Sequence, residues 1–190
     1  MRVAETVFLL SGFAATTMSA VAAEAGASKE TLYRHFGSKE GLFAEVVENR
    51  ARLLREKLDA DFDRPDAMAD VLHDLGTRLL THMHGPEVMC LLRIVISEVP
   101  RDPEIGRIFY VHGPERTRLR LAEYLGAARE RGEFHGDTDL AASIFLAAIV
   151  GSLHLVRLTH LDIPVPSPSE VQERVTEVVA MFLQRYGDAT

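Results

Sequence analysis

The residues best suited to chemistry in this sequence are basic and aromatic side chains between residues 26 and 39. This segment carries Lys29, Arg34 and Lys39 against a single acidic residue, Glu30. Basic and hydrogen-bonding side chains on one short helix suit contacts with phosphate groups and base edges. On its own, such a helix is more often a solvent-exposed face, so the neighbouring elements must decide between the two interpretations.

The distribution of charge separates this segment from the rest of the chain. The 190 residues carry a formal net charge of -7, from 21 Lys and Arg against 28 Asp and Glu. Residues 1–59 hold eight of each sign, so residues 60–190 hold the remaining 13 basic and 20 acidic residues. An evenly spread acidic charge argues against nucleic acid, because phosphates repel carboxylates. The partition instead indicates a neutral N-terminal part and an acidic remainder with separate roles.

Composition and apolar patterning limit the class of protein. Hydrophobic residues make up 47% of the chain, enough to fill a core, and Cys90 has no second cysteine to pair with. Residues 1–25 lack the charged start and continuous apolar stretch of a signal peptide. The longest apolar run, Leu140–Leu153, is shorter than the ~20 residues that span a bilayer. We therefore expect a soluble cytoplasmic protein with no membrane partner.

Helical periodicity runs through nearly the whole chain, and no segment shows the alternation of a strand. The predicted fold is all-α, with about nine helices separated by Gly, Pro and N-capping residues. Gly113-Pro114 is expected to kink or interrupt one of them. The expected helices lie at about residues 3–10, 17–25, 28–36, 38–61, 65–84, 85–99, 104–131, 137–161 and 169–186.

Two of the short helices have the pattern of a helix-turn-helix. Residues 17–25 and 28–36 are separated by about three residues, and Gly26 permits the tight turn. A small core is expected from Val7, Phe8, Val21, Leu32, Phe36, Leu42 and Phe43. The side chains then left to face outward or sideways are Lys29, Thr31, Tyr33, Arg34 and His35. A recognition helix presents its N-terminal residues to bases while its flanks hold phosphates, so this pattern predicts binding to double-stranded DNA.

The motifs of this region match a known family as an ensemble. They include Gly12-Phe13, Ala25-Gly26-Ala27-Ser28-Lys29, Leu32-Tyr33-Arg34-His35-Phe36 and Ser38-Lys39-Glu40-Gly41-Leu42-Phe43. The passage closely resembles the N-terminal domain of TetR-type transcriptional regulators, and residues 110–155 more loosely resemble AefR-like C-terminal domains. The resemblance implies a three-helix helix-turn-helix DNA-binding domain at residues 1–45. It also implies a larger helical ligand-binding and dimerisation domain at residues 46–190.

The resemblance also implies roles for single residues of the DNA-binding domain. The phosphate-gripping positions are matched by Thr17, Tyr33, His35 and Lys39, and the base-reading positions by Ser28, Lys29, Glu30 and Thr31, with Arg34 also on the DNA side. Glu30 stands where relatives often have glycine, and it either accepts a hydrogen bond from a cytosine amine or repels phosphate. The chain lacks the basic N-terminal extension of many relatives, which implies lower affinity or a truncated sequence.

The apolar helices near the C-terminus predict a homodimer. Residues 140–158 are apolar on nearly every side, so that helix must be covered all round. Small residues that permit close approach are Ala141, Ala142, Ala147, Ala148 and Gly151. We expect the last two helices, at about 138–161 and 169–186, to pack against their copies around a twofold axis. A symmetric dimer implies a palindromic operator.

Polar side chains on otherwise apolar faces of the middle helices are candidates for binding a small organic ligand. They are His73, Met89, Arg93, Tyr110, His112, Tyr124 and His154. The sequence has no metal-ligand spacing, glycine-rich phosphate loop or nucleophile motif, so we expect no metal, no cofactor, no catalytic residue and no enzyme activity. The predicted function is a repressor that a ligand releases from DNA. The alternative is a dimeric small-molecule-binding or adaptor protein with weak or no DNA binding.

Overall fold

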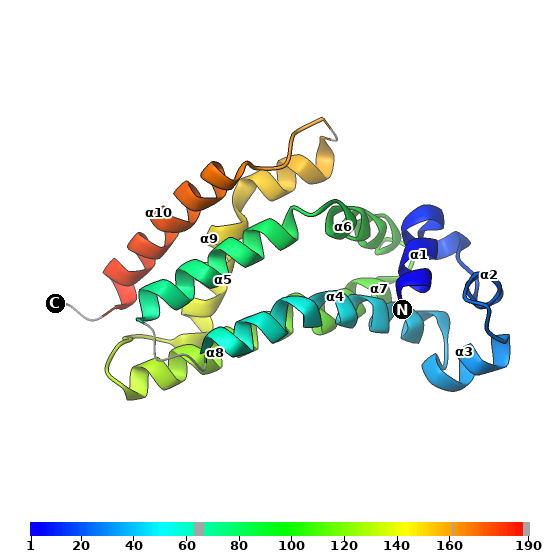
Figure 1. Ribbon diagram of the computed structural model, residues 1–190, viewed down its shortest axis with the longest axis horizontal. Helices are drawn as coiled ribbons and strands as arrows, with labels where there is room; N and C mark the ends of the chain where they lie inside the picture. The colour runs from blue at the N-terminus through cyan, green and yellow to red at the C-terminus, as the bar shows by residue number, and fades with distance from the viewer. Residues whose placement is uncertain (63–66, 161, 188–190) are drawn as a thin grey trace. The chain divides into compact units, whose positions relative to one another are not determined.

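The chain forms ten helices and no named strand in the part that the structure describes (Figure 1). The computed structural model describes residues 1–62, 67–160 and 162–187, with side chains except those of residues 53–55 and 57–62. This all-α architecture confirms the predicted fold class, while the boundary expected between the helices at about 38–61 and 65–84 lies outside the described residues. The helices are α1 (Arg2–Ala15), α2 (Met18–Glu24), α3 (Lys29–Phe36), α4 (Lys39–Phe62), α5 (Met68–Met83), α6 (Pro86–Glu98), α7 (Pro103–His112), α8 (Pro114–Glu130), α9 (Thr138–Thr159) and α10 (Pro168–Tyr186).

The tenth helix arises because Gly113-Pro114 interrupts the helix expected over residues 104–131. Gly113 has the non-helical angles φ -112° and ψ -100°, and its N–H bonds back to the carbonyl of Phe109. A residue that precedes proline is disfavoured in the helical region, so α7 ends here and Pro114 opens α8.

The described chain divides into two compact units, each built around its own apolar core. Unit 1 contains Met1–Leu53 and Pro86–Glu115, and unit 2 contains Leu54–Gly85 and Arg116–Thr190. Unit 1 therefore holds the predicted helix-turn-helix, and unit 2 holds α9 and α10.

The core of unit 1 includes the small core expected from the sequence. Phe8 and Phe43 are fully buried, with ring centroids 5.3 Å apart in an edge-to-face arrangement, and Phe13 meets Phe43 in the same way. Val21 and Leu32 lie in this cluster, which also takes in residues of α6 and α7. Each aromatic pair adds about 0.5–1.5 kcal/mol beyond its burial, so α1 and α4 form a firm base for α2 and α3.

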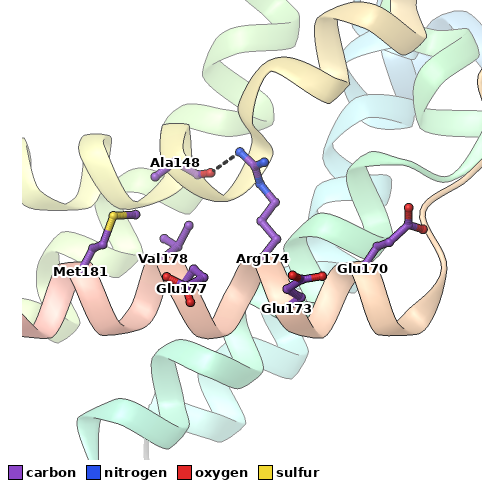
Figure 2. Close-up of a pocket in the computed structure, with 7 residues that line it drawn as sticks. All are labelled: Ala148, Glu170, Glu173, Arg174, Glu177, Val178 and Met181. Carbon is purple, nitrogen blue, oxygen red and sulfur yellow. Dashed lines mark hydrogen bonds between the residues drawn. The ribbon is translucent and has the colours of Figure 1, made fainter.

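α9 of unit 2 contains a break, whereas the sequence predicts one continuous helix at about residues 137–161. Gly151 has φ 60° and ψ -169°, which interrupts the helix, so its role is not merely to allow close packing. Arg174 of α10 donates from Nε to the carbonyl of Ile149 at 2.9 Å. It also donates from Nη2 to the carbonyl of Ala148 at 2.8 Å (Figure 2). The guanidinium therefore satisfies carbonyls next to the break. The φ of Gly151 lies in the left-handed region that favours glycine, and a Cβ there would lie 1.7 Å from Arg174 Nη2 and displace the guanidinium.

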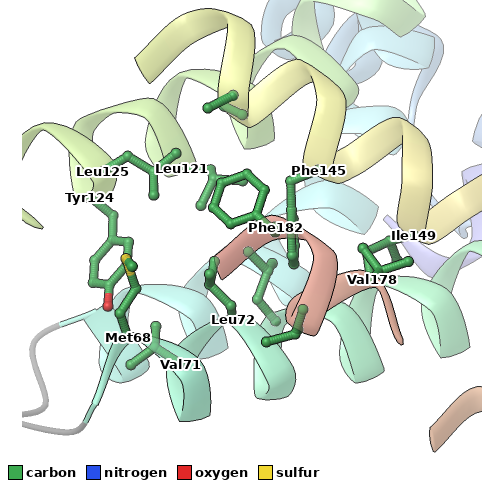
Figure 3. Close-up of a cluster of buried hydrophobic side chains, with 14 of the residues drawn as sticks. Met68, Val71, Leu72, Leu121, Tyr124, Leu125, Phe145, Ile149, Val178 and Phe182 are labelled. Atoms are coloured by element: carbon green, nitrogen blue, oxygen red, sulfur yellow. The ribbon is translucent and has the colours of Figure 1, made fainter. Parts of the chain in front are cut away.

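The core of unit 2 joins α5, α8, α9 and α10 (Figure 3). Phe145 of α9 and Phe182 of α10 meet edge to face with centroids 5.2 Å apart. Ser167 and Glu170 form a reciprocal capping box that fixes the start of α10. The last helix is thus anchored at its first turn and along its buried face, which positions its other face for contacts outside the core.

By length and composition alone α9 is apolar enough to cross a membrane, a criterion that the core helix of a soluble protein also meets. Its 22 residues extend beyond the apolar run Leu140–Leu153, and 22% of its most apolar window is buried within the chain. Large apolar side chains such as Leu155, which is 65% exposed, remain uncovered. Another protein surface can cover such a helix as a membrane can.

Candidate nucleic-acid interface

α2, the turn and α3 are held in a fixed geometry by hydrogen bonds at each end. Thr17 accepts from the backbone N–H of Ala20 and so caps α2. At the other end Gly26 has φ 63°, and the N–H of Ala27 bonds to the carbonyl of Ala22. This Schellman arrangement turns the chain sharply into α3, and α2 and α3 pack against each other.

Two of the predicted base-reading hydroxyls are engaged with each other. Ser28 Oγ caps α3 by accepting from the Thr31 N–H at 3.1 Å, and the two side-chain hydroxyls lie 2.9 Å apart. The pair therefore stabilises the first turn of α3. Lys29 and Glu30, which lie between them in sequence, are exposed at the same helix end.

The remaining polar side chains of α3 lie outside the core. Tyr33 is 44% exposed, and Lys29 Nζ lies 5.7 Å from the centre of its ring, so the ammonium leans over the aromatic face. Arg34 and His35 are also exposed. The predicted DNA contacts of α3 are thus exposed, except Thr31, which is half-buried, while Leu32 faces the core.

Lys39 has an internal role that sequence analysis missed. Its Nζ donates to the carbonyl of Phe13 at 2.9 Å and to that of Ala14 at 3.4 Å, and it lies 4.3 Å from the Phe13 ring centre. These contacts tie the start of α4 to the end of α1. An ammonium has three protons, so this arrangement leaves donor capacity for a phosphate. The partners lie 26 and 25 residues away in sequence, which hides the contact from local patterns.

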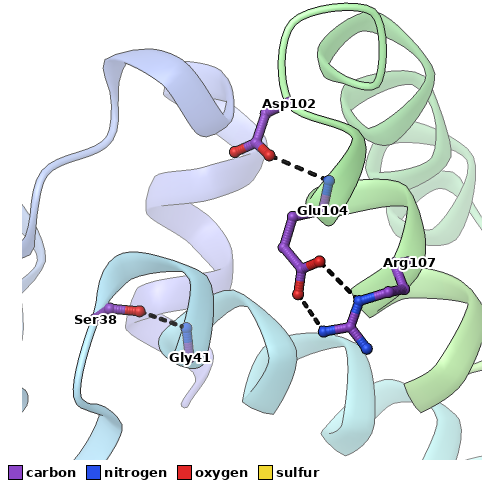
Figure 4. Close-up of polar contacts among 5 residues, drawn as sticks. All are labelled: Ser38, Gly41, Asp102, Glu104 and Arg107. Atoms are coloured by element: carbon purple, nitrogen blue, oxygen red, sulfur yellow. Dashed lines mark hydrogen bonds and ion pairs between the residues drawn. The ribbon is translucent and has the colours of Figure 1, made fainter.

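The junction between α3 and α4 is tight. Ser38 Oγ accepts from the Gly41 N–H at 3.1 Å (Figure 4). A Cβ at Gly41 would lie 2.0 Å from the carbonyl oxygen of Phe36, so a larger residue would displace the end of α3. Elsewhere in unit 1, Asp102 caps α7 and Glu104 pairs with Arg107 on its surface. The Ser38 cap and the close approach at Gly41 therefore define where α3 ends and α4 begins.

The seven ligand-binding candidates are divided between the two units. Met89, Arg93, Tyr110 and His112 belong to unit 1, and His73, Tyr124 and His154 belong to unit 2. They differ in environment: Met89 and Tyr124 are buried, Tyr110 is exposed, and Arg93, His73, His112 and His154 are half-buried.

Two of these candidates have polar partners within unit 1. Tyr110 donates its hydroxyl to Glu115 at 2.7 Å, and His112 Nδ1 lies 3.5 Å from a carboxylate oxygen of Glu48. The Tyr110 hydroxyl is therefore engaged within unit 1, whereas the distance between His112 and Glu48 is longer than a usual hydrogen bond.

A buried polar cluster in unit 2 involves two residues that sequence analysis did not single out. Arg157 Nη1 donates to His84 Nδ1 at 2.9 Å and to the His84 carbonyl at 2.8 Å. Because a guanidinium only donates, Nδ1 accepts and the neutral ring carries its proton on Nε2. The His84 and His154 rings lie 5.6 Å apart, so one candidate residue joins this cluster.

The cluster holds both histidines in their neutral form. Burial, followed by the charge of Arg157, lowers the pKa of His84 from 6.5 to about 4. Burial and Arg157 lower the pKa of His154 as well. The desolvated imidazoles lie beside a fixed positive charge, which disfavours a second charge in the same place.

A surface cavity of about 480 Å³ lies along α10 in unit 2 (Figure 2). None of the seven ligand-binding candidates lines it. Its lining residues are Ala148, Glu170, Glu173, Arg174, Glu177, Val178 and Met181. Three carboxylates and one apolar strip make it a poor match to an enclosed organic-ligand pocket. Among the described residues, no group of three or more His, Cys, Asp or Glu is placed to hold a metal ion.

Family models match both parts of the chain. Residues 1–46 match the model described as bacterial regulatory proteins of the tetR family, and residues 70–188 match the AefR-like transcriptional repressor C-terminal domain. The helix-turn-helix with an exposed basic recognition helix defines a DNA-binding transcriptional regulator. The chain belongs to the TetR family of such regulators.

Similar proteins cover nearly the full fold. A TetR-family regulator from Mesorhizobium loti is 29% identical, with a TM-score of 0.81 over 98% of this chain and 94% of that one. The flavonoid-responsive regulator FrrA is 32% identical, with a TM-score of 0.78 over 100% of this chain and 95% of its own. The Bacillus subtilis HTH-type transcriptional regulator YezE is 27% identical over 138 residues, 69% of each protein. These relatives are transcriptional regulators and not enzymes.

Proposed function

We propose that the protein is a repressor that binds a palindromic operator as a homodimer and is released by a small organic ligand. The observation that carries the proposal is the exposed polar face of α3 on a rigid base. Lys29, Tyr33 and Arg34 are exposed there, while Leu32 anchors the helix in the core of unit 1. A recognition helix needs this combination of display and fixed position.

The proposed DNA contacts divide into two kinds. Phosphates are held by Thr17, Tyr33, His35 and Lys39, and bases are read by Ser28, Lys29, Glu30 and Thr31, with Arg34 beside them. Thr17 and Ser28 already cap helices, so their hydroxyls hold the helix ends in place near the DNA. We assign DNA binding to residues 1–45 and ligand binding with dimerisation to residues 46–190, in keeping with the family models at 1–46 and 70–188.

Dimerisation through α9 and α10 is supported by apolar surface that the chain leaves uncovered. Leu140, Ile144, Leu155 and Met181 are all exposed on these helices. Covering them with a second copy removes apolar surface from water at about 25 cal/mol per Å². Met181 also lines the acidic cavity along α10, so the cavity adjoins this apolar surface. The twofold symmetry of such a dimer requires a palindromic operator.

Release by a ligand requires that the ligand binds the DNA-incompetent state more tightly than the DNA-bound state. The family model of the C-terminal part is that of a repressor, and FrrA is by its name responsive to flavonoids. These relationships support a small organic ligand for this chain. The candidates for contact with such a ligand are Met89, Arg93, Tyr110 and His112 if it binds in unit 1, and His73, Tyr124 and His154 if it binds in unit 2. Because its target is DNA, we expect the protein to act in the cytoplasm.

Selection from random DNA duplexes tests the proposal. We expect an enriched palindrome, and weaker binding of all duplexes when Tyr33 is replaced by alanine, with an unchanged salt dependence because its phenol neutralises no phosphate charge. Glu45→Gln, an exposed change on α4, is the control and should retain the selected motif. If the full-length protein enriches no sequence, the alternative of a dimeric ligand-binding or adaptor protein with weak or no DNA binding replaces this proposal.

A further inference from the structure

The first turn of α3 carries one carboxylate among the residues proposed to face DNA. Glu30 is exposed, and among the described residues its carboxylate makes no hydrogen bond or ion pair, not even with Arg34 one turn further on. A carboxylate placed at a DNA surface repels phosphates, so its presence there requires a compensating contact or costs affinity.

The neighbouring groups are occupied in ways that leave Glu30 available. The hydroxyls of Ser28 and Thr31 bond to each other, and Ser28 also caps the helix. Lys29 Nζ lies over the ring of Tyr33, which is one turn further along the same face of the helix. At the N-terminal end of α3, the Glu30 carboxylate is therefore an acceptor that is not engaged with these neighbouring side chains.

The chemistry of base edges restricts what an ionised carboxylate can read. It only accepts hydrogen bonds, and in the major groove donors are offered by the amines of cytosine and adenine. Adenine also presents the acceptor N7 beside its amine, which repels the second carboxylate oxygen. Cytosine presents its amine with no acceptor of its own on that edge. A carboxylate on a recognition helix therefore favours cytosine.

We infer that Glu30 is a specificity-determining residue that accepts a hydrogen bond from the amine of one cytosine in each operator half-site. The inference rests on the proposed function, since it requires that α3 enters the major groove. It assigns sequence information to a residue whose charge opposes general affinity for DNA. The hydrogen bond of Glu30 then depends on which base is present, whereas the repulsion between its carboxylate and the phosphates is the same for every base.

The test compares motifs selected from random duplexes by the full-length protein and by Glu30→Gln. The amide has the same shape but can also donate, so it pairs with adenine as well. We expect a C·G pair at one position per half-site for the parent, and a loss of discrimination there on the order of tenfold for Glu30→Gln. The rest of the motif should not change. Glu45→Gln removes the same charge from the surface of α4 and should leave the cytosine preference intact.

The outcomes separate this inference from the proposed function. If Glu30→Gln binds all duplexes more tightly and retains the parent motif, Glu30 only repels phosphate and the inference is overturned while the proposed function stands. If neither protein enriches any sequence, both are overturned. Thermal unfolding of the two variants shows whether any change in preference reflects loss of the fold, since an acidic residue in the first turn also stabilises a helix.

Discussion

The buried His84 makes the stability of the protein depend on pH in a definite direction. Its side chain belongs to a residue only 1% exposed, with Arg157, His154 and Arg174 as the charged and titratable groups that act on it. Because its folded-state pKa is about 4 and its ordinary value is 6.5, the unfolded chain binds a proton more readily between these values. Unfolding is therefore favoured as the pH falls through this window.

The magnitude follows from the difference between the two pKa values. One pKa unit corresponds to about 1.4 kcal/mol, so the full contribution of His84 is about 3 kcal/mol. This contribution to the free energy of unfolding is fully present above pH 6.5. About 2 kcal/mol of it is lost when the pH falls to 5. His154 adds a loss of the same sign, because its pKa is lowered as well.

Urea unfolding followed by circular dichroism at pH 7 and pH 5 measures this effect. The informative variant is His84→Asn, whose amide oxygen can accept from Arg157 in place of Nδ1 but does not titrate. The parent should lose about 2 kcal/mol more than this variant between the two pH values, at equal protein concentration. His160→Asn, an exposed change, should behave as the parent. Equal losses in the parent and His84→Asn would show that protonation of His84 does not cause the loss of stability.

Three further substitutions test separate features of the structure. Gly151→Ala places a Cβ against Arg174 in a glycine-only conformation, and should lower the free energy of unfolding by roughly 2–4 kcal/mol in urea titrations. Lys39→Met removes the tie between α4 and α1, and should lower both the melting temperature and the slope of DNA affinity against salt. Leu155→Glu puts a charge on the exposed apolar face of α9 and should convert a dimer to a monomer in light scattering.

Control substitutions show whether each of these effects is specific to the residue that is changed. Gly126→Ala is a change in α8 with open space around the new Cβ, and it should not destabilise the protein. Leu119→Glu adds the same charge to a partly exposed position of α8 and should leave the oligomeric state unchanged. An unaltered melting temperature for Lys39→Met would show that its bonds to the α1 carbonyls contribute nothing to stability. A dimeric Leu155→Glu would argue against α9 as the dimer face.

Local features of the sequence were sufficient to predict the helix-turn-helix and its supporting helices. Thr17 and Ser28 are capping residues by type, and each caps the helix expected of it. Gly26 supplies the positive φ needed at the turn, and Leu32 and Phe43 fall in the predicted core. These features depend on residues within a few positions of one another, which is why periodicity and capping rules found them.

Contacts between residues distant in sequence were not predictable in the same way. Gly151 reads as a small residue in an apolar helix, and its break becomes visible only with the Arg174 guanidinium beside it. His84 and Arg157 lie 73 residues apart, so no local pattern joins them. The role of Lys39 also depends on carbonyls of another helix. In each case a polar side chain satisfies backbone groups that only the folded chain brings near.

The most direct test of the central claim is the affinity of the full-length protein for its selected palindrome relative to a scrambled duplex of the same length. Fluorescence anisotropy at physiological salt, with the stoichiometry determined by light scattering, gives both quantities. We expect at least about 10³-fold tighter binding to the palindrome, with two protomers on each duplex. Equal affinity for the two duplexes would show that the protein does not recognise a specific DNA sequence.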